Sequence, residues 1–438
     1  MNPCLFRFAA TVLAVCGLIV SAAFAGDVPL TLGEAQRLAT ARSTQLEASG
    51  LMVSASEEMA VAAGELPDPE LKFGVDNLPV DGPDQFSLER DFMTMTQVGV
   101  MQEFTRPRKR RLRAERAQRA VQLAEAERVM SLASVQRATT LAWLDRYYAE
   151  AMERSVREQV NAAGLEVTAA EAAYRAGQGG SADVLAARGA LAELEDQVAD
   201  ASRRVRGSTI ALARWVGEDA ERPLRGKAPI DVIPFHPHEI ASRLAEHPEI
   251  LALQRQAELA QTEVELARAS KRPDWSVELM YSQRGDEFSN MVSLEFTVPL
   301  QINPGDRQNR ELAAKLAEAS QARAHREDML RKHVADLRAM VDEWQSVRDR
   351  RDRYSATIIP LATDRTAATF AAYRGGKASL TEVLAARRNE TDVQLRALQI
   401  ESEAARLWAE ITYITPASAD SASAAAPSSD TTTSEDHQ

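Results

Sequence analysis

The sequence predicts a mainly α-helical protein built from long helical hairpins, with a small β part of four strands. Three observations predict this fold: a duplicated segment, two long stretches almost without proline or glycine, and four short segments in which apolar and polar residues alternate. The composition agrees. Only 5% of the 438 residues are aromatic and 26% are charged, which suits helices packed side by side better than large globular cores.

The charge balance argues against nucleic acid as a partner. The chain has 52 Lys and Arg against 64 Asp and Glu, a net charge of −12, whereas duplex phosphates are held by clustered cations. One basic run, 106–113, follows a predicted strand. We interpret it as a contact with phospholipid headgroups at a membrane rim.

The first residues, 1–25, are typical of a signal peptide. Arg7 precedes an apolar run, 8–20, and Ala23-Phe24-Ala25 forms a cleavage site. The alternative is a lipoprotein signal with a lipidated Cys16. Both cysteines, Cys4 and Cys16, lie inside this segment, so the mature chain is expected to form no disulfide. No later segment has the roughly 20 apolar residues of a membrane-spanning helix, which argues against an inner-membrane transporter.

The rest of the chain repeats itself. Residues 172–188 align without gaps to 371–387 with ten identities, so Tyr174 recurs as Tyr373, 199 residues later. This duplication predicts two structural repeats, 26–222 and 239–415, rather than a short-period solenoid. A proline-rich connection, 223–238, would join them. The last residues, 416–438, are expected to be a disordered tail.

Each repeat is expected to contain a long helical hairpin. The stretch 107–175 has only Gly164 as a helix breaker, and the matching stretch 306–374 has only Pro360. At 1.5 Å per residue each helix would be about 100 Å long, with a bend near its breaker. The turns at 176–181 and 375–379 would form the hairpin tips. Gly177 and Gly376 are expected to be left-handed caps, and Ser181 and Ser379 to be N-caps.

Four strands are expected at about 70–78, 92–105, 274–283 and 291–301. Their apolar residues alternate with polar ones and are expected to share one face: Leu71, Phe73, Val75, Trp275, Val277, Leu279, Val292, Leu294 and Phe296. Two hairpins on a soluble core would give the same pattern. Export and the great helix length favour an outer-membrane barrel instead, with these residues facing lipid. Four strands cannot close a barrel, but three chains would supply twelve.

The chain resembles the TolC-like outer-membrane efflux proteins over nearly its whole mature length. The resemblance rests on the segment 30–35, the two Tyr-Arg-x-Gly…Val-Leu-Ala-Ala-Arg tips, and the strand pair before each long helix. It implies a homotrimer with a shared 12-stranded transmembrane β-barrel in the outer membrane and a trimeric α-barrel through the periplasm. One departure is Ser43-Thr44, where the family often has Asn-Pro.

The resemblance also implies partners and a role. The tips would meet a periplasmic adaptor of the membrane fusion type and an inner-membrane RND pump, and the chain would be a passive conduit, without enzymatic activity or a cofactor. The segments 66–70, 76–79 and 92–104 look like the heavy-metal efflux branch, so heavy-metal cations are the expected cargo. The alternatives are a drug- or protein-export channel of the same fold, or a rod-like periplasmic adaptor or scaffold.

The expected functional residues lie mainly at the tips. Adaptor binding is expected at Tyr174, Arg175, Gly177, Tyr373, Arg374, Gly376 and Lys377, and a gate at Asp183 and Glu382. The alternative is that the charged residues only cap helices. Met93, Met95 and Met101 share parity on one predicted strand and could offer thioethers to a soft cation, although methionine also commonly fills apolar surface. The histidines, among them His236, His238, His325 and His333, are interpreted as linker or helix surface, with a metal-ligand cluster as the alternative.

Overall fold

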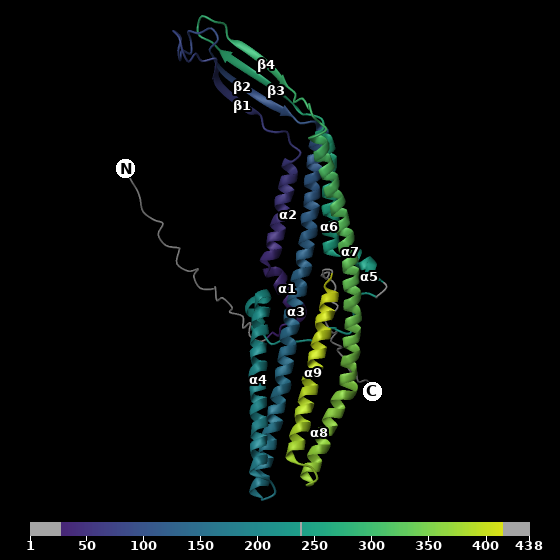
Figure 1. Cartoon of the computed structure of the whole chain (residues 1–438). Coiled ribbons are helices and arrows are strands. Elements are labelled where there is room, and N and C mark those ends of the chain that lie inside the picture. The colour runs from purple at the N-terminus through teal and green to yellow at the C-terminus, as the bar shows by residue number, and fades with distance from the viewer. Residues whose placement is uncertain (1–27, 237–238, 415–438) are drawn as a thin grey trace, which may run out of the picture.

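The computed structural model describes residues 28–236 and 239–414. They form an elongated rod with a β-sheet at one end and two helical hairpin tips at the other (Figure 1). The expected signal peptide, with Cys4 and Cys16, lies outside the described residues, as do His238 and the expected tail, 416–438. In the described part of the chain, no helix is both long enough and apolar enough to cross a bilayer.

Both repeats contain two shorter helices, two strands and a long hairpin, in that order. The first has α1 (Leu32–Arg42), α2 (Thr44–Ala62), β1 (Glu70–Asp76), β2 (Met95–Phe104), α3 (Pro107–Arg175) and α4 (Ser181–Val216). A short 3-10 helix, η1 (Gly217–Glu221), follows. The second has α5 (Ile240–Ala245), α6 (Pro248–Ser270), β3 (Trp275–Gln283), β4 (Met291–Thr297), α7 (Gln308–Arg353), the π-helical turn η3 (Tyr354–Ile358), α8 (Ile359–Arg374) and α9 (Leu380–Thr412).

The two long helices differ in continuity. α3 is a single helix of 69 residues, with Pro107 at its first turn, where the missing N–H is not needed. Its counterpart is interrupted by η3 just before Pro360. Because Pro360 has no N–H for the carbonyl four residues earlier, the wider turn accommodates the gap. Both long helices were expected to bend near their breakers, Gly164 and Pro360. Only the second has an interrupted hydrogen-bond pattern, since α3 runs through Gly164 without a break.

The four strands form one antiparallel sheet in the order β1-β2-β3-β4, so the two repeats meet where β2 pairs with β3. The strands are shorter than expected. β2 begins at Met95 rather than residue 92, because Asp91 Oδ1 accepts the N–H of Met93 in a tight turn. β4 ends at Thr297 rather than 301, since Pro299 has no N–H for a strand ladder.

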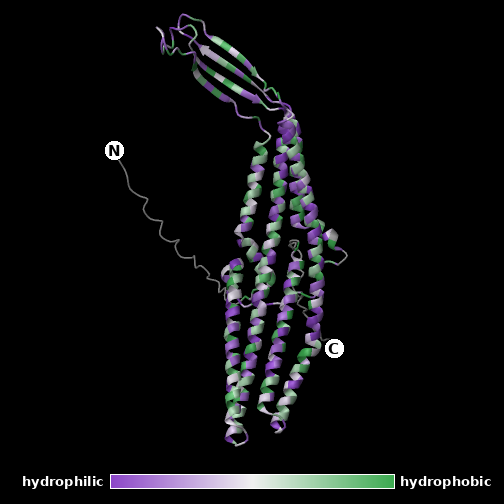
Figure 2. Cartoon of the chain, viewed as in Figure 1, coloured by the Kyte–Doolittle hydropathy of each residue, from purple (hydrophilic) through white to green (hydrophobic). Residues whose placement is uncertain are grey.

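The strand register places the nine predicted apolar side chains on one face of the sheet. Phe73 lies opposite Val98, and Leu279 lies opposite both Val100 and Leu294. Most of this face is uncovered, with Phe73 83% and Val292 70% exposed. The alternation of hydrophobic and hydrophilic residues along the strands is visible in Figure 2. Burial within the chain therefore does not explain the pattern.

The main core lies at the level where α4 and α9 end. It gathers aromatic and aliphatic side chains from both repeats, including Trp143, Leu212, Trp344 and Trp408. The indole Nε1 of Trp143 donates to the carbonyl of Leu30, 3.2 Å away, before α1. The Nε1 of Trp344 donates to the carbonyl of Ile230, also 3.2 Å away, before α5. Each long helix thus holds the segment that leads into its own repeat.

Candidate functional site: the hairpin tips and the sheet faces

The first hairpin tip is closed by a glycine turn. α3 ends at Arg175, and Gly177 follows with a φ of +72°. The N–H of Gly177 donates to the carbonyl of Tyr174 at 3.0 Å, and the N–H of Gln178 to that of Ala173 at 2.9 Å. These two bonds form a Schellman motif, which satisfies carbonyls that a helix end leaves unpaired.

The second tip repeats this turn and adds a side-chain cap. Gly376 has a φ of +69°, and the N–H of Lys377 donates to the carbonyl of Ala372 at 2.8 Å. Ser379 Oγ accepts the N–H of Glu382 at 3.3 Å, while Glu382 Oε2 accepts the N–H of Ser379 at 2.7 Å. This capping box confirms Ser379 as the N-cap. Its hydrogen bonds hold the pKa of Glu382 below the usual value.

The corresponding expectation for Ser181 is wrong. Gly180 is the N-cap of α4, and Ser181 is the first helical residue. The reason is the alignment of the two tips, in which Gly180 rather than Ser181 matches Ser379. Asp183 still supports the helix start, because its Oδ2 accepts the N–H of Gly180 at 3.0 Å.

Asp183 and Glu382 thus have the same local role. Each side chain caps the start of its own helix, in agreement with the alternative interpretation of these charges. Among the described residues of this one chain, no ion pair involves either carboxylate. Arg175, Arg374 and Lys377 likewise appear in no ion pair of the described chain. Gating by ion pairs between chains stays a prediction.

The two tip tyrosines have different surroundings. Tyr373 packs against a small core formed by Ala170, Ala187, Leu380 and Val383, where the two hairpins meet. Tyr174 is 53% exposed and lines a groove of about 380 Å³ on the first hairpin, together with Arg175, Val184 and Leu185. The groove therefore combines an aromatic ring and apolar side chains with a free guanidinium.

A buried ion cluster joins the hairpins above the tips. Arg387 on α9 binds Glu166 on α3 at 3.1 Å and Glu390 at 3.3 Å. Thr363 on α8 donates to Glu390 at 3.0 Å. Glu166 and Glu390 are both buried, so this cluster is costly to break. Sequence reasoning missed it. The available signal was Arg387 itself, the last residue of the duplicated segment.

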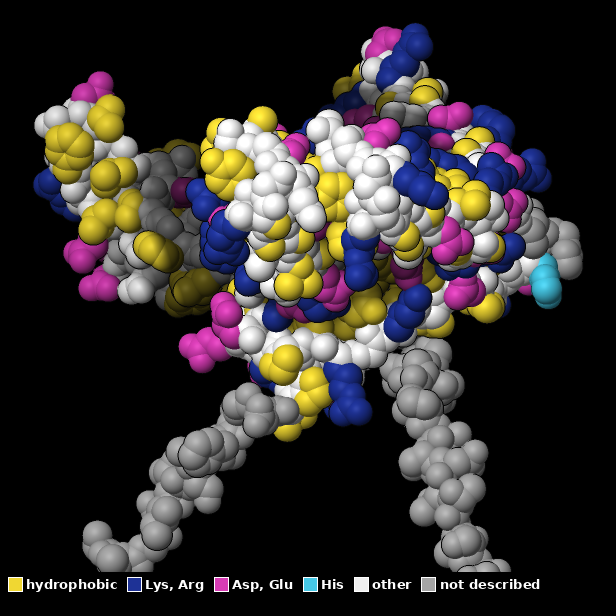
Figure 3. Space-filling model, turned by 90° about the horizontal axis from the view of Figure 1, so that it is seen from below, with side chains coloured by type: hydrophobic (Ala, Val, Ile, Leu, Met, Phe, Trp, Pro, Cys, Tyr) yellow, Lys and Arg dark blue, Asp and Glu magenta, His cyan; other side chains and the backbone are white. Residues whose placement is uncertain are grey.

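The tip end carries no large patch of one charge. Seen from below, Lys and Arg side chains are interspersed with Asp, Glu and apolar ones (Figure 3). A partner that binds this end must therefore match both signs of charge as well as exposed apolar groups.

The second face of the sheet is polar. Lys72 on β1 pairs with Glu278 on β3, and Glu278 lies opposite Glu295 on β4. Lys72 lies opposite Gly99. A Cβ at Gly99 would come within 2.9 Å of the Leu279 carbonyl, so glycine allows the close packing of β2 on β3.

The methionines are split between this face and a loop. Met95 and Met101 have the parity of Gln97 and Gly99, on the polar face of β2. Met93 lies in the turn before β2, so the expectation that all three share a strand is wrong for Met93. Met95 and Met101 therefore do not help to fill the exposed apolar face.

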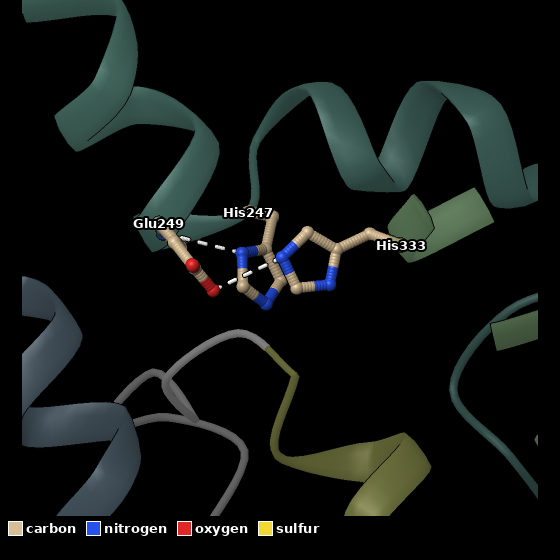
Figure 4. A group of neighbouring side chains, drawn as sticks. All are labelled: His247, Glu249 and His333. Atoms are coloured by element: carbon tan, nitrogen blue, oxygen red, sulfur yellow. Dashed lines mark hydrogen bonds and ion pairs between the residues drawn. The ribbon is translucent and has the colours of Figure 1, made fainter. Parts of the chain in front are cut away.

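Three side chains with metal-ligating atoms meet near the middle of the rod. His333 Nε2 on α7 lies 3.0 Å from Glu249 Oε2 on α6, and its ring lies against that of His247, with centroids 4.6 Å apart (Figure 4). The interpretation of His333 as plain helix surface is wrong, because it bonds across 84 residues. His325 is exposed. Burial, then the nearby His333, lowers the pKa of His247 to about 4, which leaves the ring neutral near pH 7.

Comparison with known proteins agrees with this architecture. Residues 240–415 match the family described as outer membrane efflux protein. The match spans the second repeat of the chain. Members of that family are passive channels of the outer membrane and not enzymes, and the family implies a partnership in a tripartite pump.

Individual relatives cover most of the chain. The cobalt-zinc-cadmium resistance protein CzcC of Cupriavidus metallidurans is 24% identical over 378 residues, 85% of this chain and 86% of that protein. The outer membrane protein VceC of Vibrio cholerae has a TM-score of 0.71 at 19% identity, over 87% of this chain and 95% of VceC. CusC has a TM-score of 0.74 at 14% identity, over 89% and 93%. These likenesses cover both repeats.

Proposed function

We propose that three copies of the chain form the outer-membrane duct of a tripartite efflux system and that the cargo is heavy-metal cations. The observation that carries the proposal is the uncovered sheet at one end of a rod. One face of that sheet is apolar and exposed, the other is polar, and β1 and β4 are open edges. A lone sheet of this kind is unstable in lipid, where backbone groups at an edge have no water to bond.

Three copies would give the exposed apolar face a place in lipid and would pair the open strand edges. β4 of one chain would pair with β1 of the next, which closes a barrel of twelve strands with its apolar face toward lipid. The polar face, with Lys72, Glu278 and Glu295, would then line a water-filled lumen. The helices of three chains would continue the lumen as a tunnel through the periplasm. The scaffold alternative leaves the exposed apolar face without a role.

The tips would be the partner-binding and gated end. The groove beside Tyr174 and Arg175 and the turns at Gly177 and Gly376 are available for an adaptor of the membrane fusion type, which would couple the duct to an RND pump in the inner membrane. Energy would come from that pump. The duct would contribute a path that opens when the hairpins move apart, with Asp183 and Glu382 stabilising the closed tips.

The relatives support heavy-metal cations as the cargo. CzcC is named for resistance to cobalt, zinc and cadmium, and it matches this chain over most of its length. Met95 and Met101 on the polar sheet face would expose thioethers to a passing cation.

Deletion of the gene tests the cargo. Cells without the chain should lose tolerance to Co²⁺, Zn²⁺ or Cd²⁺ and regain it with the wild-type chain, but not with an empty vector. Tolerance to dyes and detergents should change little. Unchanged metal tolerance with new sensitivity to drugs would contradict the heavy-metal assignment and favour a drug channel of the same fold.

A further inference from the structure

We propose that His247, Glu249 and His333 form a binding site for a divalent cation such as Zn²⁺ or Co²⁺. Each residue offers one ligand atom, and these atoms all lie within 4.8 Å of one another. Two imidazole nitrogens and one carboxylate oxygen are the ligand set of many zinc sites, and it suits borderline cations better than soft or hard ones. The site is independent of the cargo in the duct.

One pair of ligand atoms already has about the spacing that an ion requires. Zinc bonds to nitrogen and oxygen are about 2.0–2.2 Å long, so neighbouring ligand atoms in a tetrahedral site lie roughly 3.3 Å apart. His333 Nε2 and Glu249 Oε2 are already 3.0 Å apart. His247 and His333 have adjacent rings (Figure 4). A cation would replace the hydrogen bond between His333 and Glu249 and would bind to both side chains.

Acidic groups outnumber basic ones around the three residues. The three residues line a cavity of about 410 Å³ between helices of both repeats. The cavity wall also carries Asp336 and Glu410 as acidic groups and Arg137 as a basic one. Counting Glu249, three carboxylates face one guanidinium. Three protein ligands leave a fourth coordination position, which has room for water.

Binding would exchange one helix cap for a link between helices. His247 is the N-cap of α6, and its Nδ1 accepts the N–H of Glu249 at 3.2 Å. A neutral imidazole has one lone pair, so its proton is then on Nε2. An ion bound at Nδ1 uses that lone pair directly, and an ion bound at Nε2 moves the proton to Nδ1. Either way the cap is lost, and the start of α6 is tied to α7 instead.

The test is metal binding by the purified full chain in detergent, with any affinity tag removed. Zn²⁺ is followed by calorimetry and Co²⁺ by its visible absorption, which is strong only in tetrahedral sites. The wild-type chain should bind one ion per chain. The His333→Gln and Glu249→Gln variants should not bind this ion. Zn²⁺ should also raise the unfolding temperature of the wild-type chain and not of these variants.

Two further variants make the result decisive. His325→Gln changes a histidine on the same helix outside the cluster, and it should bind metal like the wild-type chain. His247→Asn keeps an oxygen that can cap α6 but removes the ring, so it should fold normally and lose the ion. Equal stoichiometry and affinity for Zn²⁺ in the wild-type chain and all three cluster variants would overturn the proposal, whatever the cargo experiment gives.

Discussion

At the scale of single residues, the backbone at the tips explains the choice of glycine. Gly177 and Gly376 both have positive φ angles, and apart from the glycine itself and its two chain neighbours, no atom lies within 4 Å of the position that a Cβ would occupy. Crowding therefore does not require glycine there. The left-handed conformation does, because it brings a Cβ too close to the following carbonyl.

Gly376→Val should disturb the tip without affecting assembly. The strain of a side chain at positive φ is about 1–2 kcal/mol or more for a β-branched residue, and it falls at the end of the rod opposite the sheet. We expect normal amounts of assembled protein but little efflux, measured as metal tolerance of complemented cells. Gly375→Val is the matched control, since Gly375 has a φ of −84°. Equal efflux by both variants would contradict a functional role for the turn.

The two faces of β4 should respond oppositely to charge. Leu294 is 60% exposed on the apolar face, whereas Glu295 lies on the polar face opposite Glu278. Leu294→Arg should cost about 2–4 kcal/mol if it lies near the bilayer midplane and should reduce assembled protein in outer-membrane fractions. Glu295→Arg should be tolerated, because it places an arginine beside a glutamate. Equal losses of assembled protein from both substitutions would refute the assignment of Leu294 to the lipid side and Glu295 to the lumen side.

The sequence predicts a residue's role where that role depends only on a few neighbouring positions. Gly177, Gly376 and Ser379 were identified because a helix end needs a glycine or a hydroxyl within a few positions. Ser181 was misplaced by one residue, which is the usual uncertainty of a helix boundary. The bonds of His333 to Glu249 and of Arg387 to Glu166 span 84 and 221 residues. They depend on helix packing that one sequence does not reveal.

At the scale of elements, the helix starts at the tips depend on single carboxylates. Asp183 and Glu382 each accept a backbone N–H at the cap of α4 or α9. Replacing either by alanine leaves that N–H unpaired within the helix start. Both caps lie where the hairpins meet, so their loss should loosen the tips.

The double variant Asp183→Ala with Glu382→Ala should raise ion leak through the protein in planar bilayers. The expected change is higher resting conductance, with the open conductance unaltered because the sheet end is untouched. Asp145→Ala, on the helical body away from the tips, serves as the control. Unchanged resting conductance in the double variant would show that the caps do not hold the tips closed.

The packing of α6 should weaken in acid. Glu263 on α6 binds Arg116 on α3 at 2.8 Å and Lys315 on α7 at 2.9 Å. Burial raises the pKa of Glu263, but these bonds outweigh it and hold the pKa below the usual value. A lowered carboxyl pKa adds stability above the unfolded pKa of about 4.3, and that stability is lost as the pH falls through the folded pKa.

Glu263→Gln tests this network. Between pH 6 and pH 3, the unfolding temperature of the wild-type chain should fall more steeply than that of the variant. The difference should be small, because partly exposed ion pairs contribute only about 0.2–1 kcal/mol each. Glu57→Gln, on an exposed position of α2, should leave the pH dependence unchanged. If the unfolding temperatures of the wild-type chain and Glu263→Gln fell in parallel with pH, the ion pairs of Glu263 would not account for the loss of stability in acid.

Whole elements were predictable where the pattern is long or strict. The unbroken run from Pro107 to Arg175 predicted both ends of α3, and strict alternation predicted which side chains share a sheet face. The strand ends were less well predicted. The turn at Asp91 and the effect of Pro299 act on two or three residues each, a range in which alternation gives no signal. The π-helical turn before Pro360 was also missed, because proline predicts an interruption and not its form.

At the scale of the whole molecule, the chain is an incomplete object. Its sheet has two open edges and an exposed apolar face, and such edges invite pairing with another strand. The sequence predicted this incompleteness from the strand count. It did not predict that β2 and β3 join the repeats into one sheet, because strand pairing depends on the fold.

The assembled state is therefore expected to contain three chains. Cross-linking of outer-membrane fractions should give a trimer, and native mass spectrometry in detergent should give three times the mass of the mature chain. Boiling should convert this species to monomers. A dominant dimer, or a monomer in detergent-free extract, would contradict a barrel of twelve strands.

The hydrogen bonds of Trp143 and Trp344 hold the two long helices at equivalent points. Between these points and the tips, the two hairpins differ, and the difference has a mechanical consequence. α3 is held at Trp143 and continues as one rigid helix to its tip. α7 is held at Trp344, and ten residues further on the π-helical turn changes the direction of the helix (Figure 1). The second hairpin thus has a hinge between its anchor and its tip, and the first has none. In an assembly of three chains, alternate hairpins would swing while the others stay fixed, so the aperture would widen with threefold rather than sixfold symmetry.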